Sequence, residues 1–269
     1  MCSSDLNRKL GPYMHRLAQR WRESHGLDAH ACHLGELEVR NGRVWLAGQA
    51  VDIIARMFLL EYLLEPGAAE LMEPVLGAVA RGEVTMFTPL DSELFGSKVT
   101  LAMISDERNQ AEFSAAERAA AAELVPWTRL VRPGPVTLED GQQADLFDYA
   151  VSHADDLVLK PALRFGGQGV LAGWHAQTSP QLWREQLSKA MNGPYVLQRR
   201  ISPVPELFPG EDSTQIPWIV VWGLYTGVNG LSGIISRAVT VSSGHAVLNV
   251  SAGAQMGCCL YPWPDSGRA

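Results

Sequence analysis

The sequence contains no long apolar run. No stretch within its 269 residues approaches the roughly 20 consecutive apolar residues that a membrane-spanning helix needs. The first 20 residues also lack the apolar centre of a signal peptide. We therefore expect no membrane partner and a cytoplasmic location.

Cysteine and basic charge are both scarce. The four cysteines show no C-x-x-C spacing, and adjacent cysteines rarely bridge each other because the geometry is strained. A net charge of −7 and a pI near 5.5 argue against a nucleic-acid partner, since a general nucleic-acid binder carries a basic face. Arg199 and Arg200 could form a local basic patch, and surface solvation or pairing with Glu206 is the other interpretation.

What is present suits an ordered protein with a substantial core, since 46% of the residues are hydrophobic. Alternating residues around Asn41-Gly42 predict a β-hairpin over 37–46. The other elements expected before residue 94 are a helix over 8–24 interrupted by Pro12, a buried strand over 51–58, a helix over 59–80 broken near Pro66-Gly67 and Pro74, and a strand over 84–87. Strands that alternate with helices imply an α/β layer with a parallel sheet.

Two charged residues of this region, Asp52 and Arg56, have two interpretations. They could contact a substrate, or they could form an internal salt bridge or a helix-end contact. Further along, Ser179, Pro180 and Gly193 predict the start and end of a helix.

Residues 157–170, LVLKPALRFGGQGV, join a predicted strand to a glycine-rich turn. Two apolar residues precede Lys160, which ends the strand with a cation that needs an anionic partner. Gly166, Gly167 and Gly169 permit positive φ and let backbone N–H groups approach phosphate oxygens closely. The segment predicts a nucleotide phosphate site, and a surface lysine followed by a glycine hairpin is the alternative.

The order of these motifs resembles the ATP-grasp superfamily over roughly residues 35–260. Through its segments VDIIARMF, SKVTLAMISDE and VPWTR, the chain looks most similar to the glutathionylspermidine-synthase-like and related uncharacterised ATP-grasp proteins. The positions that match are Lys98 at the start of a helix, Lys160 before the glycine turn, Gln198 at the end of a strand over 194–198, Arg237 in a strand over 233–241 and Asn249 in a strand over 246–254.

The resemblance implies a role for each position. Lys98 and Lys160 would contact the phosphates and the adenine region of ATP, while the glycine turn would close over the phosphates. Gln198 would receive the adenine edge, and Arg237 would stabilise an acyl phosphate. The residues add support at two positions: a lysine at a helix start opposes the helix dipole, and an unpaired arginine in an apolar strand is costly.

Magnesium is where the chain departs from the family pattern. No Asp or Glu occurs from 213 to 264, where ATP-grasp proteins place acidic metal ligands, and Mg²⁺ favours carboxylate oxygen. Asn249 is the candidate ligand. Glu206, Glu211 or Asp212 would reach in from the preceding loop, or substrate phosphates would hold the metal alone, or the chain would not catalyse phosphoryl transfer.

We therefore expect an α/β preparatory domain over 1–94 and an ATP-grasp module over 95–269, made of two α+β lobes, 95–195 and 196–269. Residues 1–6, MCSSDL, match one frame of a sequencing-adapter tail, and we expect them to be an assembly artefact.

The expected function is that of an ATP-dependent carboxylate–amine ligase that works through an acyl phosphate. Its cofactors would be ATP and Mg²⁺, its partner a small-molecule or peptide substrate, and a homodimer is one expected assembly. The alternative is a degenerate ATP-grasp protein that binds nucleotide and serves as a partner or regulatory subunit.

Overall fold

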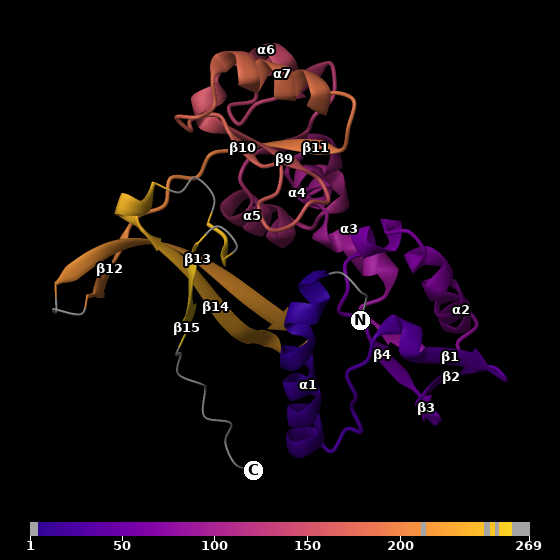
Figure 1. Cartoon of the computed structure of the whole chain (residues 1–269). Coiled ribbons are helices and arrows are strands. Elements are labelled where there is room, and N and C mark those ends of the chain that lie inside the picture. The colour runs from indigo at the N-terminus through magenta and orange to yellow at the C-terminus, as the bar shows by residue number, and fades with distance from the viewer. Residues whose placement is uncertain (1–4, 211–213, 245–247, 251–252, 260–269) are drawn as a thin grey trace. The chain divides into compact units, whose positions relative to one another are not determined.

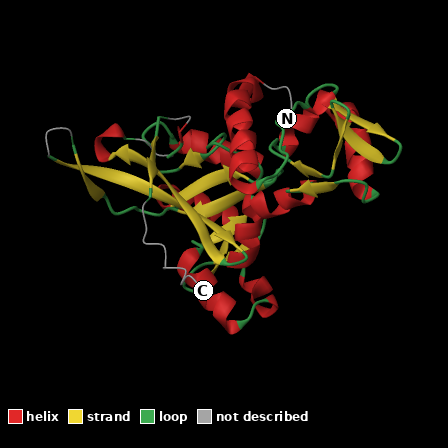
Figure 2. Ribbon diagram, turned by 90° about the horizontal axis from the view of Figure 1, so that it is seen from below, coloured by secondary structure: helices red, strands yellow, loops and turns green. Residues whose placement is uncertain are grey.

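The computed structural model describes residues 5–210, 214–244, 248–250 and 253–259. Residues 1–4 of the expected artefact, and Glu211 and Asp212, lie outside this range. Helices and separate sheets occur together along the chain, which makes the fold a mixed α/β fold (Figure 1, Figure 2). Among the described residues, no helix combines the length and apolarity needed to cross a bilayer.

The chain divides into two compact units, here called the N-terminal unit (Met1–Phe95) and the C-terminal unit (Gly96–Ala269). The regular elements of the N-terminal unit before α3 (Glu93–Gly96), in chain order, are α1 (Asp5–His25), the 3₁₀ helix η1 (Leu34–Glu36), β1 (Leu37–Arg40), β2 (Arg43–Leu46), β3 (Gln49–Val51), β4 (Ile53–Ala55), the 3₁₀ helix η2 (Leu60–Leu64), α2 (Ala68–Ala80), β5 (Thr85–Phe87) and the 3₁₀ helix η3 (Leu90–Ser92).

Strands β1, β2 and β3 form an antiparallel sheet, whereas β4 and β5 pair in parallel across the η2–α2 connection. The hairpin predicted over 37–46 is confirmed, and both of its turn residues have positive φ, 52° at Asn41 and 70° at Gly42. These two angles match the tight turn that Asn-Gly favours. The parallel pairing expected for this region is limited to the three-residue pair β4–β5.

Helix α2 begins after Gly67, as expected, but it does not break at Pro74. Met72, Val75 and Ala78 are buried on one face of the helix, where they contribute to the core of the unit. Pro74 removes one backbone hydrogen bond from the helix. The burial of this face stabilises the helix enough to carry it past the proline. Helix α1 likewise continues through Pro12 rather than being interrupted there.

The C-terminal unit begins within α3 (Glu93–Gly96) and contains a four-stranded antiparallel sheet of order β10-β9-β11-β6, here called the Lys160 sheet. After α3, the elements of the unit up to residue 199, with the strands of this sheet among them, are in chain order α4 (Lys98–Ser105), the 3₁₀ helix η4 (Glu107–Glu112), α5 (Ala115–Leu124), β6 (Thr128–Leu130), β7 (Pro135–Thr137), β8 (Gln143–Asp145), α6 (Leu146–Ser152), the 3₁₀ helix η5 (Ala154–Asp156), β9 (Leu157–Pro161), β10 (Leu171–Ala172), α7 (Pro180–Ala190) and β11 (Tyr195–Arg199). Strand β11 spans the 195/196 position where the two lobes were expected to meet, so the hydrogen bonding of this sheet extends through Arg199.

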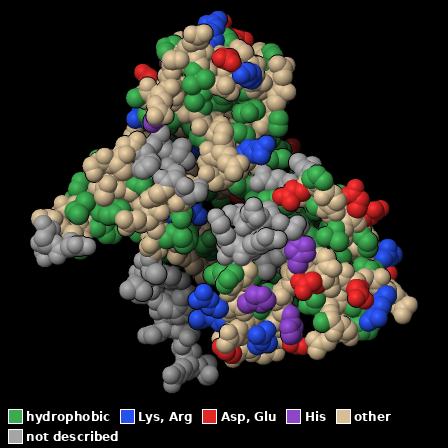
Figure 3. Space-filling model, in the orientation of Figure 1, with side chains coloured by type: hydrophobic (Ala, Val, Ile, Leu, Met, Phe, Trp, Pro, Cys, Tyr) green, Lys and Arg blue, Asp and Glu red, His purple; other side chains and the backbone are tan. Residues whose placement is uncertain are grey.

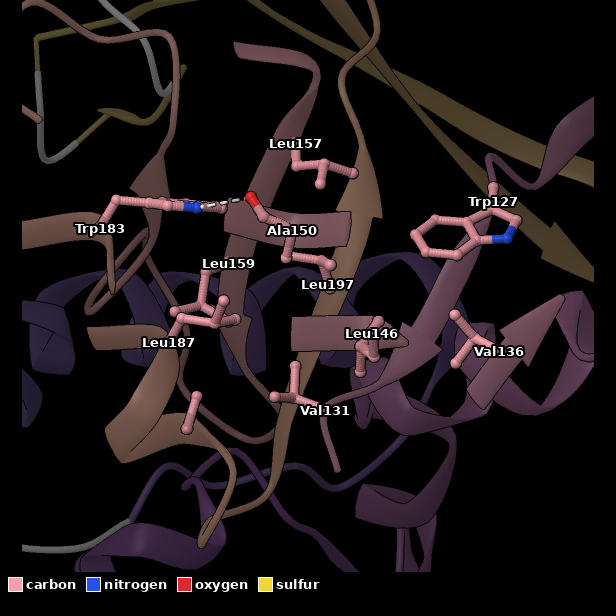
Figure 4. Close-up of a cluster of buried hydrophobic side chains, with 11 residues drawn as sticks. Trp127, Val131, Val136, Leu146, Ala150, Leu157, Leu159, Trp183, Leu187 and Leu197 are labelled. Atoms are coloured by element: carbon pink, nitrogen blue, oxygen red, sulfur yellow. Dashed lines mark hydrogen bonds between the residues drawn. The ribbon is translucent and has the colours of Figure 1, made fainter. Parts of the chain in front are cut away.

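Helices α6 and α7 supply the core of this region together with alternate residues of the sheet. Leu157, Leu159 and Leu197 project from β9 and β11 into this core (Figure 4). Trp183 of α7 is buried there, and its indole N–H donates to the carbonyl of Ala150 in α6 at 2.8 Å (Figure 4). The helix predicted from Ser179 is confirmed, with the serine side chain accepting from the N–H of Leu182.

A second four-stranded antiparallel sheet, here called the Arg237 sheet, follows. Its strands are β12 (Glu206–Pro209), β13 (Gln215–Gly227), β14 (Gly230–Thr240) and β15 (Gln255–Cys258). Large apolar side chains are exposed along the β13–β14 hairpin, and green side chains gather over it in Figure 3. The strand expected over 246–254 is wrong for the described part of that range, because 248–250 and 253–254 have no strand hydrogen bonding.

The α7 face gives a stability prediction. Leu187 is fully buried in the helix, so Leu187→Ala should lower the free energy of unfolding by about 2–5 kcal/mol through lost burial and the resulting cavity. The same substitution at Leu124, which is 76% exposed at the end of α5, should change it by about 0.5 kcal/mol or less. Urea unfolding followed by circular dichroism measures both values, and equal losses would contradict the core assignment.

Candidate functional site

Lys160 lies on the face of the Lys160 sheet opposite to Leu159 and the α6–α7 core. It is half-buried near the end of β9, directly across from Val196 in β11. Its Nζ donates to Oε1 of Gln198, two residues further along β11 and on the same face, at 2.5 Å. Gln198 is itself buried, so the ammonium group of Lys160 contacts a buried polar side chain of the sheet.

The glycine-rich segment is a loop of nine residues, 162–170, between β9 and β10. Gly166, Gly167 and Gly169 all have positive φ, at 65°, 79° and 69°. Within the part of the chain that the structure describes, their N–H groups donate to no backbone carbonyl. The strand-to-glycine-turn arrangement is therefore present, with three amide donors available to an anion.

Lys98, the first residue of α4, is joined to this loop twice. Its backbone N–H donates to the carbonyl of Ala162 at 3.0 Å, and its Nζ donates to the carbonyl of Arg164 at 2.6 Å. Its ammonium also lies 5.8 Å from the ring centre of Phe165. The helix start is capped by Ser97, whose hydroxyl accepts from the N–H of Val99. Two segments more than sixty positions apart thus meet at the loop.

The electrostatics of the two lysines are unusual. Burial lowers the pKa of Lys98 below its ordinary value. The pKa of Lys160 is also lowered, first by burial and then by the nearby positive charge of Lys98. Among the described residues, no carboxylate pairs with either ammonium group. An anion bound between them would offset the cost of burying these two charges.

Thr128 extends this polar group across the sheet. It lies directly opposite Gln198 on β6, and its Oγ1 accepts from Gln198 Nε2 at 2.9 Å. Its hydroxyl donates to the carbonyl of Pro126 at 2.7 Å. Nothing in the sequence singles out Thr128, because its partner lies 70 positions away and a threonine in a strand is unremarkable by itself.

Arg237 and Asn249 are not part of the Lys160 sheet: Arg237 belongs to the Arg237 sheet, and Asn249 belongs to no strand. Arg237 is half-buried on β14, between Val221 and Met256 of the neighbouring strands, and its side chain makes no hydrogen bond or ion pair with the residues that the structure describes. Asn249 lies outside any strand, and its carbonyl accepts from the N–H of Ala254 at 3.0 Å. Their expected roles stay predictions.

The donor set does not fit a magnesium site within the described residues. No group of three or more His, Cys, Asp or Glu side chains converges there. Glu206 accepts from the indole N–H of Trp222 at 3.0 Å, while Glu211 and Asp212 lie outside the described range. We therefore derive no step through Mg²⁺.

Two sets of charged residues have structural roles. Arg56 is buried and pairs with Glu93 at 2.8 Å, which is the internal salt bridge rather than a substrate contact. Arg199 pairs with Glu139, not with Glu206, and its guanidinium also donates to the hydroxyl of Tyr149 at 2.9 Å. These partners raise the pKa of Arg199 above its ordinary value.

No model of a known protein family matches the chain, and no curated protein matches it. Among solved structures, it is similar to D-cycloserine synthetase DcsG, with 17% identity and a TM-score of 0.45 over 96% of this chain and 74% of that one. It is also similar to D-alanyl-alanine synthetase A from Vibrio cholerae, with 10% identity and a TM-score of 0.35 over 80% of this chain and 55% of that one. Both scores lie below 0.5, so the proposal below rests on the residues of this chain.

The lowered pKa of Lys160 gives a pH prediction. The native state releases the Lys160 proton at lower pH than the unfolded chain, whose lysine pKa is about 10.4. Between the lowered pKa and about pH 10.4, the unfolded state therefore binds more protons, and the stability contributed at this position rises with pH. The free energy of unfolding of the unmodified chain minus that of Lys160→Met should increase over this window.

Lys189 supplies the matched control, because it is exposed and pairs with Glu185 on the surface of α7. Urea unfolding at several pH values from 7 to 10 compares the two variants, and the difference for Lys189→Met should not rise with pH. A flat difference for Lys160→Met would contradict the burial of an uncompensated cation.

Proposed function

We propose that the C-terminal unit binds the phosphates of ATP and that the chain is an ATP-grasp carboxylate–amine ligase. The observation that carries the proposal is the meeting of Lys98 and Lys160 beside the glycine loop, with no carboxylate among the described residues to neutralise them. Phosphate oxygens match this environment, since they accept from ammonium groups and from free backbone N–H groups together.

In the proposed complex, each residue has a defined task. Lys98 and Lys160 neutralise the α- and β-phosphates, and the glycine loop covers the phosphates with its amides. Gln198 and the adjoining backbone receive the adenine edge. Arg237, whose guanidinium has no partner among the described residues, contacts the acyl phosphate through that planar group.

The proposed reaction has two balanced steps. A substrate carboxylate oxygen attacks the γ-phosphorus, the bond to the β–γ bridging oxygen breaks, and ADP leaves with that electron pair. An amine nitrogen then attacks the acyl carbon and the carbon–oxygen bond to phosphate breaks. Phosphate leaves as the nitrogen loses its proton. The carboxylate and amine come from a small-molecule or peptide substrate.

One observation favours the second candidate, a nucleotide-binding protein without ligase activity that acts as a partner or regulatory subunit. The sequence from 213 to 264, which contains most of the Arg237 sheet, has no Asp or Glu to hold a metal. The two candidates differ in turnover: both bind ATP, and only the ligase releases ADP when carboxylates and amines are supplied. The cytoplasmic location, the homodimer and the likeness to glutathionylspermidine-synthase-like proteins stay predictions.

Nucleotide binding is tested by calorimetry with ATP, with and without Mg²⁺. Lys160→Met should weaken ATP binding about tenfold or more, because a buried charge-assisted contact is lost. Lys189→Met should bind as the unmodified chain does. Arg237→Met should retain binding within about twofold and lose ADP release against pools of carboxylates and amines. Unchanged ATP affinity in a folded Lys160→Met variant would refute the phosphate site.

The glycine loop gives an independent prediction. Among the described residues, the N–H groups of its three glycines donate to no backbone carbonyl, so hydrogen exchange at these glycines, within 164–170, should be fast without nucleotide and slow with ATP. Exchange in α7, whose backbone bonds are internal to the helix, serves as the reference and should not change. Exchange over 164–170 that stays fast at saturating ATP would count against a nucleotide role for the loop.

A further inference from the structure

Three polar side chains lie on one face of the Lys160 sheet, one on each of three adjacent strands. Lys160 is on β9, Gln198 on the central strand β11, and Thr128 on β6. Thr128 is fully buried, and its backbone N–H is held by the hydroxyl of Ser105 at the end of α4, at 2.9 Å. The backbone of Thr128 is therefore held in place at one end of the row that these three side chains form.

The hydrogen bonds of this row have a direction. A threonine hydroxyl has one proton to donate. The Thr128 proton goes to the carbonyl of Pro126, a group that can only accept, at 2.7 Å. Towards Gln198 the oxygen of Thr128 can then only accept, so the amide presents its Nε2–H to Thr128 at 2.9 Å and turns its Oε1 to Lys160.

The reversed amide would be costly. It would place the NH₂ group of Gln198 against the ammonium of Lys160, which has three donors and no acceptor. The carbonyl of Pro126 would also lose its donor if the hydroxyl of Thr128 turned to follow the amide. Lys98 is the other charged group that acts on Lys160, and it adds positive charge rather than an acceptor. Gln198 Oε1 is thus the one hydrogen-bond acceptor of the Lys160 ammonium among the described residues.

We infer that Thr128 is a positioning residue for Lys160: by holding the amide of Gln198 in one orientation, it keeps an acceptor facing the lysine and so sets where the ammonium lies and how readily it keeps its proton. This inference rests on the geometry of the three strands. Only its consequence for ATP affinity rests on the proposed function.

The sequence allows a direct test, because the chain has only four lysines: Lys9, Lys98, Lys160 and Lys189. Protein labelled with ¹³C at lysine Cε gives four signals that titrate with pH, and the Lys160→Arg variant identifies the one from Lys160. Lys189, exposed on α7, is the internal reference.

Thr128→Val keeps the shape of the side chain but removes the hydroxyl, so the amide of Gln198 is free to reverse. The pKa of Lys160 should fall by about one unit or more, as expected when a charged group loses its acceptor. Thr128→Ser retains the hydroxyl and should restore the original titration. An unchanged Lys160 titration in Thr128→Val, or the same fall in Thr128→Ser, would overturn the inference.

A second comparison separates positioning from loosened packing. Gln198→Leu removes the acceptor itself and should lower the pKa of Lys160 at least as far as Thr128→Val does. The double variant should match Gln198→Leu alone, because Thr128 acts only through Gln198. Additive shifts would mean that Thr128 acts by another route, and they would overturn the inference. If Thr128→Val proved poorly folded, the pKa of Lys160 in Gln198→Leu would be compared with that in Thr128→Ser, and equal values would overturn the inference.

The same spectra separate this inference from the proposed function. If ATP moves neither the Lys98 nor the Lys160 signal while the Thr128 variants behave as described, the phosphate site fails and the positioning role stands. If ATP moves both signals and Thr128→Val titrates like the unmodified chain, the proposed site stands and the positioning role fails.

Discussion

The C-terminal unit holds two ammonium groups, those of Lys98 and Lys160, beside its glycine loop, and among the described residues neither group pairs with a carboxylate. Lys160 is held by an amide and Lys98 by a loop carbonyl, both neutral acceptors that orient a cation without cancelling its charge. A carboxylate in either place would stabilise the empty fold and would compete with a phosphate. The arrangement keeps positive charge available, and the apolar core under α6 and α7 offsets the cost of doing so.

Local signals in the sequence predicted local structure well. Asn41-Gly42 identified its hairpin because two residues with positive φ suffice to define the turn. The serine cap, the proline that follows it and the closing glycine identified α7, because capping depends on residues within a few positions. Strand β9 and the glycine loop also followed from their own composition.

The contacts that complete the candidate site could not be predicted in this way. Gln198 meets Thr128 across 70 positions, and Lys98 meets the carbonyl of Arg164 across 66, so each pairing depends on strand register and chain path. The strand expected around Asn249 failed for a related reason. Its apolar residues suit a strand, yet a strand forms only where a neighbour offers hydrogen bonds, and β14 pairs with 255–258 instead.

The Arg237 sheet has a consequence for how copies of the chain behave towards one another in solution. From 213 to 264 the only Lys, Arg, Asp or Glu is Arg237, so this stretch carries +1 and the rest of the chain −8, which sum to the net −7. Exposed apolar side chains such as Leu224 and Tyr225 therefore have no acidic neighbours in sequence to keep another molecule away, and Glu206 at the start of β12 is the one acidic residue in the described strands of this sheet. Repulsion between copies comes from carboxylates elsewhere and is screened within about 8 Å at 0.15 M salt. Colloidal stability should accordingly fall as ionic strength rises, because salt weakens the repulsion and leaves the attraction between apolar sheets intact.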